Sequence, residues 1–348
     1  MGQSVAVFGA YGHTGRFVVT ELRDRGFDAL PVGRDAGRLA SFGLPFRAAS
    51  VDDPASLDAA LTGVDAVINC AGPFASTAAG VIEAALRARI PYVDVAAEIE
   101  ANLDTFTHFT ERARAAGVAV VPAMAFFGGL GDLLATTAMG DWTSADEAHV
   151  AYGLSSWHPT AGTVAAGVVS RERRAGRRVR YTGGRLEYRP GEGDLPRVDW
   201  DFPAPLGRRT VLGEFTMADV VTIPRHLAIP EVRTYMSVDA ATDLAAAAAP
   251  VAVDGLGRSA QTFTVDVVVR RGDTRRRVVA GGRDIYAVSA PLAVEAVRRI
   301  LDGQTRASGV ASAGEMFDAP DFLRALSPAV SVEWFGTEAE TADPARHA

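Results

Sequence analysis

The chain has 348 residues, of which 48% are hydrophobic and 22% are charged. This balance is typical of a folded globular protein and excludes a disordered or fibrous chain. The formal net charge of −7 disfavours nonspecific attraction to polyanions, so nucleic acid is not an expected partner. Every Lys or Arg position holds arginine. The absence of lysine excludes a Schiff-base lysine and the Tyr-x-x-x-Lys pair of short-chain dehydrogenases.

The length and the cysteine content narrow the class of protein further. A chain of this size suits two domains. Cys70 is the only cysteine, so no intramolecular disulfide can form. The sequence enters an apolar segment at once, without a basic leader, and has no apolar stretch of about 18 residues. We therefore expect a cytoplasmic protein without a membrane segment.

A glycine-rich loop follows the first apolar segment. Residues 4–8 are apolar and β-branched, and Phe17, Val18 and Leu22 then recur at helical spacing, which predicts a strand, a turn and a helix. Glycines in such a turn allow a tight bend, approach of a diphosphate and close helix packing. We predict a Rossmann loop that binds a dinucleotide through Gly9, Tyr11, Gly12, His13, Thr14 and Gly15.

The end of the second predicted strand indicates which nucleotide is bound. Residues 29–32 run into Gly33, Arg34 and Asp35. NAD enzymes place a carboxylate here for the ribose hydroxyls, whereas an arginine suits a 2′-phosphate. Arg34 therefore favours NADP(H), and Arg38 is either a second cation or a solvated helix residue. Asp35 keeps NAD open as an alternative.

Further strands are predicted at residues 44–49, 66–70, 91–95 and 118–122. Open α/β sheets bind their ligands at the carboxyl ends of the strands. Asp52 is a candidate helix cap as well as a candidate ligand, since Pro54 opens the next helix. The expected cofactor contacts after the third and fourth strands are Val51, Asp52, Cys70, Ala71, Gly72, Pro73 and Phe74.

With these segments in view, the chain resembles the saccharopine dehydrogenase-like reductase family, which includes bacterial trans-acting enoyl reductases. The resemblance is carried by the glycine loop and by residues 69–74, 92–98 and 127–132, with weaker matches at residues 160–163 and 281–286. It implies NAD(P)-dependent hydride transfer at a C=N or C=C bond. Ala96 and Ala97 stand where the family often has a hydroxyl residue and a glycine, which weakens transfer of the substrate identity.

Beyond about residue 140 the pattern changes to alternation with a period of two. Phe263, Val265, Val267 and Val269 define one face of a half-buried strand, and residues 271–273 turn it into a partner. Residues 179–188, 211–212 and 232–238 are further strand candidates, whereas residues 190–205 are predicted to be a loop. One helix is expected at residues 160–174, with a basic end that complements the helix dipole.

The chain is predicted to divide into three parts. Residues 1–138 form an NADP-binding Rossmann domain, residues 139–285 an α+β substrate domain, and residues 286–348 a C-terminal segment. Residues 291–301 are amphipathic and are closed by Gly303. The resemblance implies that this helix returns to the Rossmann domain.

A hydride transferase needs a dry pocket and a group that gives or takes a proton. Tyr286 and His226 are considered for this proton-transfer group in addition to the main candidates, and each candidate also has an ordinary structural explanation. No histidine spacing matches a metal site, so we expect no metal. The candidate catalytic residues are Tyr92, Asp94, Glu98, Tyr152 and His158.

The sequence thus predicts an α/β protein with a Rossmann-type doubly wound parallel sheet and a second α+β domain whose sheet is largely antiparallel. The expected function is NADPH-dependent hydride transfer to a C=N bond or an activated C=C bond of a small biosynthetic substrate in secondary metabolism. The alternative is a regulatory Rossmann protein that senses NADP(H) without turnover. The expected partner is a small-molecule substrate, and a homodimer is compatible with the sequence.

Overall fold

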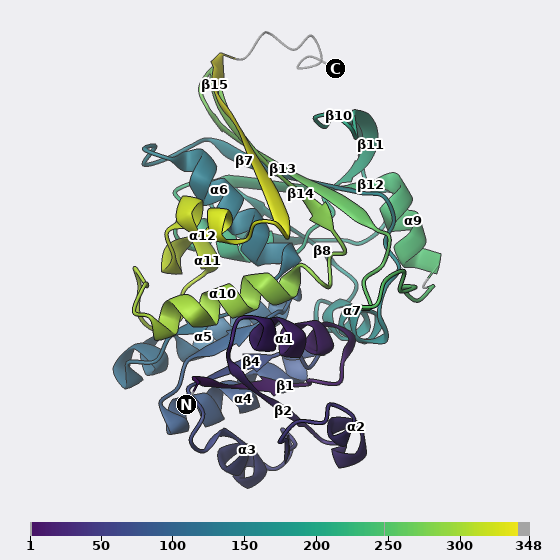
Figure 1. The fold of residues 1–348 in the computed structure, drawn as a ribbon. Coiled ribbons are helices and arrows are strands. Elements are labelled where there is room, and N and C mark those ends of the chain that lie inside the picture. The colour runs from purple at the N-terminus through teal and green to yellow at the C-terminus, as the bar shows by residue number, and fades with distance from the viewer. Residues whose placement is uncertain (1, 247, 340–348) are drawn as a thin grey trace.

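The computed structural model describes residues 2–246 and 248–339. Two sheets form its two halves, with the first sheet and its helices below and the second sheet above (Figure 1). None of the described helices is long and apolar enough to span a membrane. Both predicted parts of the fold class, a doubly wound parallel sheet and a mixed, largely antiparallel one, are confirmed.

The first sheet has six parallel strands in the order β3-β2-β1-β4-β5-β6. This is the order of a dinucleotide-binding Rossmann fold. The strand order runs outward from β1 to β3 and then continues from β4 on the other side of β1, so the order reverses between β1 and β4. The strands are β1 (Ser4–Phe8), β2 (Asp28–Gly33), β3 (Arg47–Ala48), β4 (Ala66–Asn69), β5 (Tyr92–Asp94) and β6 (Val120–Val121). Its helices are α1 (His13–Asp24), α2 (Ala36–Ala40), α3 (Pro54–Leu61), α4 (Phe74–Ala88) and α5 (Ile99–Ala116).

Local sequence explains where these helices begin and end. Asp53 caps α3 by accepting a hydrogen bond from the Ser56 amide, and Pro54 occupies the first helical position. Gly117 ends α5 in the left-handed region with φ of +67°, a conformation that favours glycine. The cap is therefore Asp53, and not Asp52 as considered from the sequence.

The second sheet has nine strands, and its main path runs β10-β11-β12-β7-β13-β14-β15. Only β7 and β12 pair in parallel. The strands are β7 (Glu147–Leu154), β8 (Arg178–Thr182), β9 (Arg185–Arg189), β10 (Arg197–Asp201), β11 (Arg208–Gly213), β12 (Glu231–Ser237), β13 (Thr262–Arg271), β14 (Thr274–Arg283) and β15 (Val330–Ala339). The remaining elements of this half are η1 (Phe126–Leu130), α6 (Gly131–Met139), α7 (Ala161–Arg173), α8 (Asp219–Thr222), η2 (Ile223–Arg225) and α9 (Val238–Ala246).

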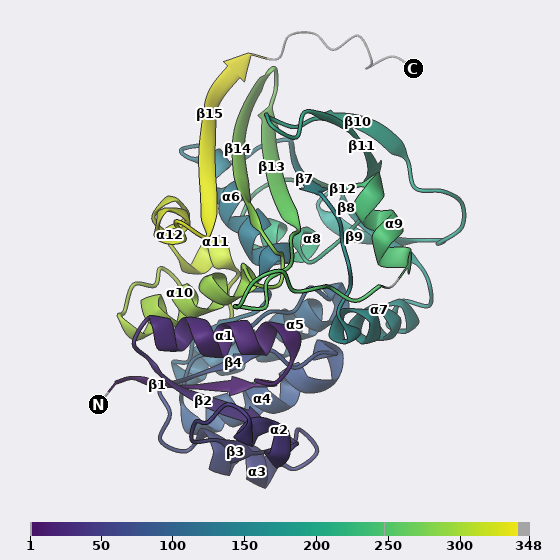
Figure 2. The ribbon, with the colours of Figure 1, turned by 45° about the vertical axis from the view of Figure 1, so that its right-hand side comes forward.

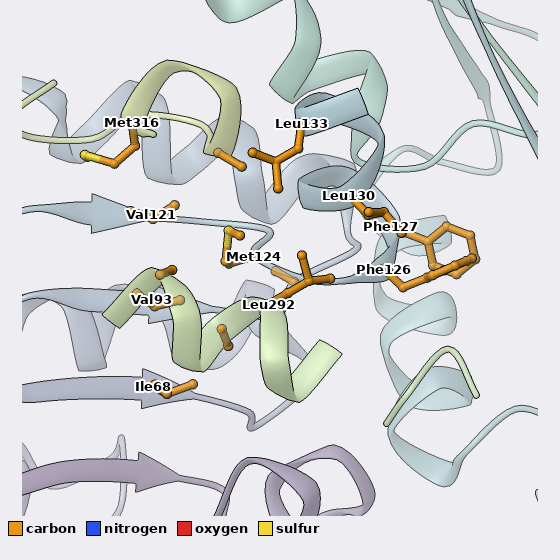
Figure 3. Packing of buried hydrophobic residues seen from close by; sticks show 14 of the residues in the cluster. Ile68, Val93, Val121, Met124, Phe126, Phe127, Leu130, Leu133, Leu292 and Met316 are labelled. Atoms are coloured by element: carbon orange, nitrogen blue, oxygen red, sulfur yellow. The ribbon is translucent and has the colours of Figure 1, made fainter. Parts of the chain in front are cut away.

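The chain then returns to the first sheet. Helix α10 (Ser289–Leu301) packs against α1, β4 and β5, between the two halves of the molecule (Figures 1 and 2). Its Leu292 lies over Ile68 and Val93 of the parallel strands (Figure 3). Two short helices, α11 (Ala313–Met316) and α12 (Ala319–Ala325), pack against α6 and lead to β15. One continuous core therefore joins the two halves.

Three predicted elements differ in the structure. The strand expected at residues 44–49 has only two residues, β3. Residues 179–188 form the two strands β8 and β9, because Gly183 and Gly184 have φ of +57° and +75° and make a tight turn. The predicted loop at residues 190–205 contains β10, which pairs with β11 despite its polar sequence.

A buried pair of polar side chains lies where η1 and α6 meet the second sheet. The Tyr152 hydroxyl donates to Oδ1 of Asp219 at 2.8 Å, and both side chains are fully buried. Gly131 permits this approach, because a Cβ atom there would overlap the same oxygen. Burial raises the pKa of the Asp219 carboxyl from 3.8 to about 6.

We predict that Asp219→Asn removes part of the pH dependence of folding. Because the pKa is higher in the folded state, the proton stabilises that state fully below 3.8 and this stabilisation is lost as the pH rises through about 6. The difference corresponds to about 3 kcal/mol in the free energy of unfolding. Denaturant titrations of wild type and variant across this pH range should diverge by that order. Parallel curves would contradict the assignment.

Candidate functional site

A cavity of about 880 Å³ lies between the glycine loop of the first sheet and elements of the second half. This volume is in the upper part of the range of about 300–1,000 Å³ for small-molecule and cofactor pockets. It meets the parallel sheet at the carboxyl edge, where open α/β sheets bind their ligands. Its lining combines the loop after β1, the residues after β4 and β5, η1, α7 and the connection from β14 to α10.

The glycine loop is shaped for an anion at the start of α1. Gly9 has φ of +80°, and a Cβ atom at Gly15 would overlap the carbonyl oxygens of Gly9 and Ala10. Both glycines therefore serve the turn and its packing, whereas Gly12 lines the cavity. Helix α1 receives no side-chain cap from the described residues and has no acidic residue in its first turn. Its first amide groups thus remain available to a ligand.

Two arginines were considered for the 2′-phosphate, and only one lines the cavity. The Arg38 guanidinium lies over the Tyr11 ring at 4.2 Å from its centroid and donates to the Tyr11 carbonyl at 3.4 Å. Both residues line the cavity. Arg34 is exposed and lies outside the lining, whereas Asp35 caps α2 through the Arg38 amide. Of the two arginines, only Arg38 therefore shares the cavity with the glycine loop.

The carboxyl ends of β4 and β5 are joined by buried polar side chains. Asn69 accepts a hydrogen bond from the Ala71 amide at 3.0 Å and donates to the Tyr92 hydroxyl at 3.1 Å. Tyr92 donates in turn to Oδ2 of Asp94 at 2.8 Å. Oδ1 of Asp94 accepts from the Ala96 and Ala123 amides at 3.0 and 2.8 Å. This network fixes the backbone of three loops that border the cavity.

The burial of this network separates it from the cavity. Burial raises the pKa of Asp94 to about 6 and the pKa of Tyr92 well above its usual value. Neither side chain is among the lining residues. Cys70 does line the cavity, and burial raises the pKa of its thiol, which keeps it protonated. Tyr92 and Asp94 therefore hold the site's backbone without direct access to a substrate.

Glu98 is the predicted acidic residue that reaches the cavity. Its two carboxylate oxygens accept hydrogen bonds from the Phe74 and Ala75 amides at 2.7 and 3.1 Å. These amides belong to the first turn of α4, so Glu98 caps this helix from another element. Burial raises the pKa of the Glu98 carboxyl, and the two amide donors partly oppose the shift. The side chain is 6% exposed and lines the cavity.

Four aromatic side chains form a wall of the cavity. The ring centroids of Phe127 and Trp157 are 5.0 Å apart, and those of Trp157 and Phe215 are 6.1 Å apart. Phe126 and Phe127 lie beyond the carboxyl ends of β4 and β6 (Figure 3). All four residues line the cavity. An apolar aromatic wall excludes water and suits a flat ring.

Tyr286 connects the second half to the glycine loop. Its ring lies edge-on to the His13 ring at 5.2 Å. Its hydroxyl accepts hydrogen bonds from Nε1 of Trp157 and from the Thr160 amide, both at 3.2 Å, and lies 3.0 Å from Oγ1 of Thr163. Trp157, Thr160 and Thr163 lie close together in the chain, and each is more than 100 positions from Tyr286. Tyr286 thus positions the start of α7 over the cavity.

The predicted cofactor contacts divide into two groups. Those lining the cavity are Tyr11, Gly12, His13, Thr14, Arg38, Cys70, Gly72 and Phe74. Those outside the lining are Gly9, Gly15, Arg34, Val51, Asp52, Ala71 and Pro73. The second group supports the loops, packs under them or faces solvent.

Two predicted catalytic residues of the second half do not reach the cavity. Tyr152 is fully buried against Asp219, and burial raises the pKa of its hydroxyl well above the usual value. His158 lies outside the lining, although its neighbour Trp157 belongs to it. His226, the further option, is 2.7 Å from Oδ1 of Asp132, and that aspartate also accepts from the Gly314 amide. None of these three side chains lines the cavity.

The aromatic wall and Thr163 were not among the site residues predicted from the sequence. Phe127 and Thr163 belong to segments that carry the family resemblance, so a signal existed for them. Trp157 and Phe215 stand in irregular segments whose pattern indicates no ligand. Their place at the cavity depends on contacts between distant parts of the chain.

Comparisons with known proteins identify the first domain and the overall fold. The family model of the saccharopine dehydrogenase NADP binding domain matches residues 5–121. Among solved structures, apo saccharopine dehydrogenase (L-Glu forming) from Saccharomyces cerevisiae is similar over 96% of this chain and 100% of that chain, with a TM-score of 0.64. The sequence identity is 12%, so this likeness shows the fold.

Other solved structures share only part of the fold. Triphenylmethane reductase of Citrobacter sp. with NADP(H) is 21% identical, covers 36% of this chain and 49% of its own, and has a TM-score of 0.29. An NADPH-dependent quinone oxidoreductase of Escherichia coli is also 21% identical, over 33% and 46%, with a TM-score of 0.27. No curated protein sequence matches the chain significantly.

The predicted resemblance is therefore confirmed for the NADP-binding domain, and with it the predicted cofactor, NADP(H). Residues 5–121 thus match the saccharopine dehydrogenase NADP binding domain, and the fold of nearly the whole chain is shared with a saccharopine dehydrogenase.

Proposed function

We propose that this protein is an NADPH-dependent reductase of a C=N bond in a small molecule. The observation that carries the proposal is one continuous cavity, which joins the uncapped start of α1 to the aromatic wall and to the Glu98 carboxyl. The cofactor, when bound, supplies a hydride. The residues of the chain then have to orient the substrate, exclude water and stabilise its charge.

The residues at the glycine loop fit the phosphates of this cofactor. The start of α1 has no side-chain cap among the described residues, and Gly12, which precedes it, lines the cavity. Arg38 adds a cation held flat over Tyr11. His13 and Thr14 complete this part of the lining.

The proton requirement favours an imine over an alkene. A protonated imine accepts a hydride at carbon without a further proton, whereas an activated alkene needs an acid at its second carbon. The Tyr286 hydroxyl, a lining group that could donate, already lies among Trp157, Thr160 and Thr163. Glu98 faces the cavity and would stabilise a cationic C=N group electrostatically.

We predict that Glu98→Gln lowers kcat/KM for imine reduction by roughly two orders of magnitude, because the counter-charge for the cation is lost. Oxidation of NADPH would be followed by absorbance with preformed cyclic imines and with enones. Glu111→Gln is the control, since Glu111 is an exposed residue of α5, the helix that begins directly after Glu98. Turnover of enones but not of imines would contradict the proposal. NADPH binding without turnover of either class would favour the NADP(H) sensor.

The cofactor loop gives a second prediction. Gly12→Val should weaken NADPH binding strongly while the protein stays folded, because the side chain would occupy space beside the α1 amides. Gly15→Val should instead lower the free energy of unfolding, since its Cβ overlaps backbone atoms. Nucleotide titration and thermal unfolding of both variants check this difference. An unchanged NADPH affinity in folded Gly12→Val would contradict the loop assignment.

The arginine positions give a third prediction. Arg38→Ala should weaken NADPH binding by roughly one to two orders of magnitude and NADH binding much less, because a charge-assisted contact with the 2′-phosphate is lost. Arg34→Ala, the matched control outside the cavity lining, should have a smaller effect. A larger loss with Arg34→Ala would restore the assignment made from the sequence. An equal loss of both nucleotides with Arg38→Ala would assign Arg38 to the adenine.

A further inference from the structure

One short segment of this acidic protein is strongly basic. Residues 171–189 contain eight arginines and two glutamates, a difference of +6, in a chain whose net charge is −7. The segment covers the last turn of α7 and the β8–β9 hairpin. One basic residue in a last turn is enough to complement the helix dipole. The dipole does not explain arginines that follow the helix.

Four of these arginines line the cavity: Arg171, Arg174, Arg177 and Arg178. With Arg38 they make five positive lining residues, against the two carboxylates of Glu98 and Glu214. The excess of three positive charges is opposite in sign to the charge of the whole chain. A cavity lined by one sign of charge attracts ligands of the other sign.

Three of the four arginines have no carboxylate partner in the described part of the chain. Arg174 lies 3.5 Å from Glu100, and Arg178 donates to backbone carbonyl groups of the loop before β10. Arg171 and Arg177 form no ion pair with any described residue. Arg177 is nevertheless oriented, because its guanidinium lies 5.0 Å from the centroid of the Tyr188 ring.

These arginines lie away from the predicted phosphate site. Tyr286 joins the glycine loop to the first turn of α7, at Thr160 and Thr163. Helix α7 has 13 residues, so its last turn lies about 14 Å along the helix axis from its first. The basic end of the cavity is therefore available to a ligand other than the nucleotide phosphates.

We propose that Arg171 and Arg177, supported by Arg174 and Arg178, form a subsite for an oxyanion group of the substrate, either a carboxylate or a phosphate monoester. A guanidinium binds both groups through paired N–H donors. The inference rests on the proposed function, because it assigns the anion to the molecule that is reduced. The substrate would then bind with its negatively charged group at the end of the cavity remote from the cofactor phosphates.

The test is calorimetric titration of the NADP⁺-saturated protein at low ionic strength. The probes are succinate, inorganic phosphate and the neutral succinamide. We expect one or both anions to bind, with added salt weakening the binding, and succinamide not to bind. The anion that binds more tightly distinguishes a carboxylate from a phosphate. Arg171→Ala and Arg177→Ala should each weaken anion binding roughly tenfold.

Arg23→Ala is the matched control, because Arg23 is also an exposed arginine in the last turn of a helix, α1. It should leave anion binding unchanged, and none of the three variants should alter the NADP⁺ affinity. If the anions bind no better than succinamide, or if Arg23→Ala causes the same loss, the subsite is wrong while the proposed function stands. If NADP⁺ itself does not bind, the proposed function is wrong. The same three probes are then titrated into the free protein, and binding of an anion but not of succinamide would still support the subsite.

Discussion

The buried carboxylate of Asp94 is the constraint on which the site depends. A charged or polar group in the interior is tolerated only when its hydrogen bonds are complete. Asp94 meets this condition with two backbone amides and the Tyr92 hydroxyl. Through Tyr92 and Asn69 it also fixes the end of β4. The loops that carry the cavity lining are therefore set by the polar core of the sheet below them.

This arrangement explains what the sequence could and could not predict. The strand, glycine turn and helix at the start follow from local pattern, and the structure has them at the predicted places. A polar residue at a strand end, such as Tyr92, gives no local sign of whether it faces a ligand or a neighbouring side chain. Strand β10 was missed because its residues Arg197–Asp201 are mostly polar, and pairing with β11 rather than burial holds it.

The same limit applies to the cavity as a whole. Arg34 stands at the position where Rossmann enzymes select their nucleotide, yet Arg38, one helical turn later, lines the cavity. Trp157, Phe215 and Tyr286 come together only because α10 returns to the first sheet and brings the end of β14 over the glycine loop. The combination of an aromatic wall, one buried carboxyl and basic residues at the remote end suits a polar substrate with separated charges.

We propose that the cavity holds NADPH with its diphosphate at α1 and its nicotinamide between Glu98 and the aromatic wall. A crystal structure of the NADPH complex tests this most directly. The account predicts the diphosphate within hydrogen-bonding distance of the amides of His13 and Thr14, and the nicotinamide ring beside Glu98 and Phe127. A nucleotide bound elsewhere, or one whose nicotinamide points away from Glu98 into solvent, would contradict the account.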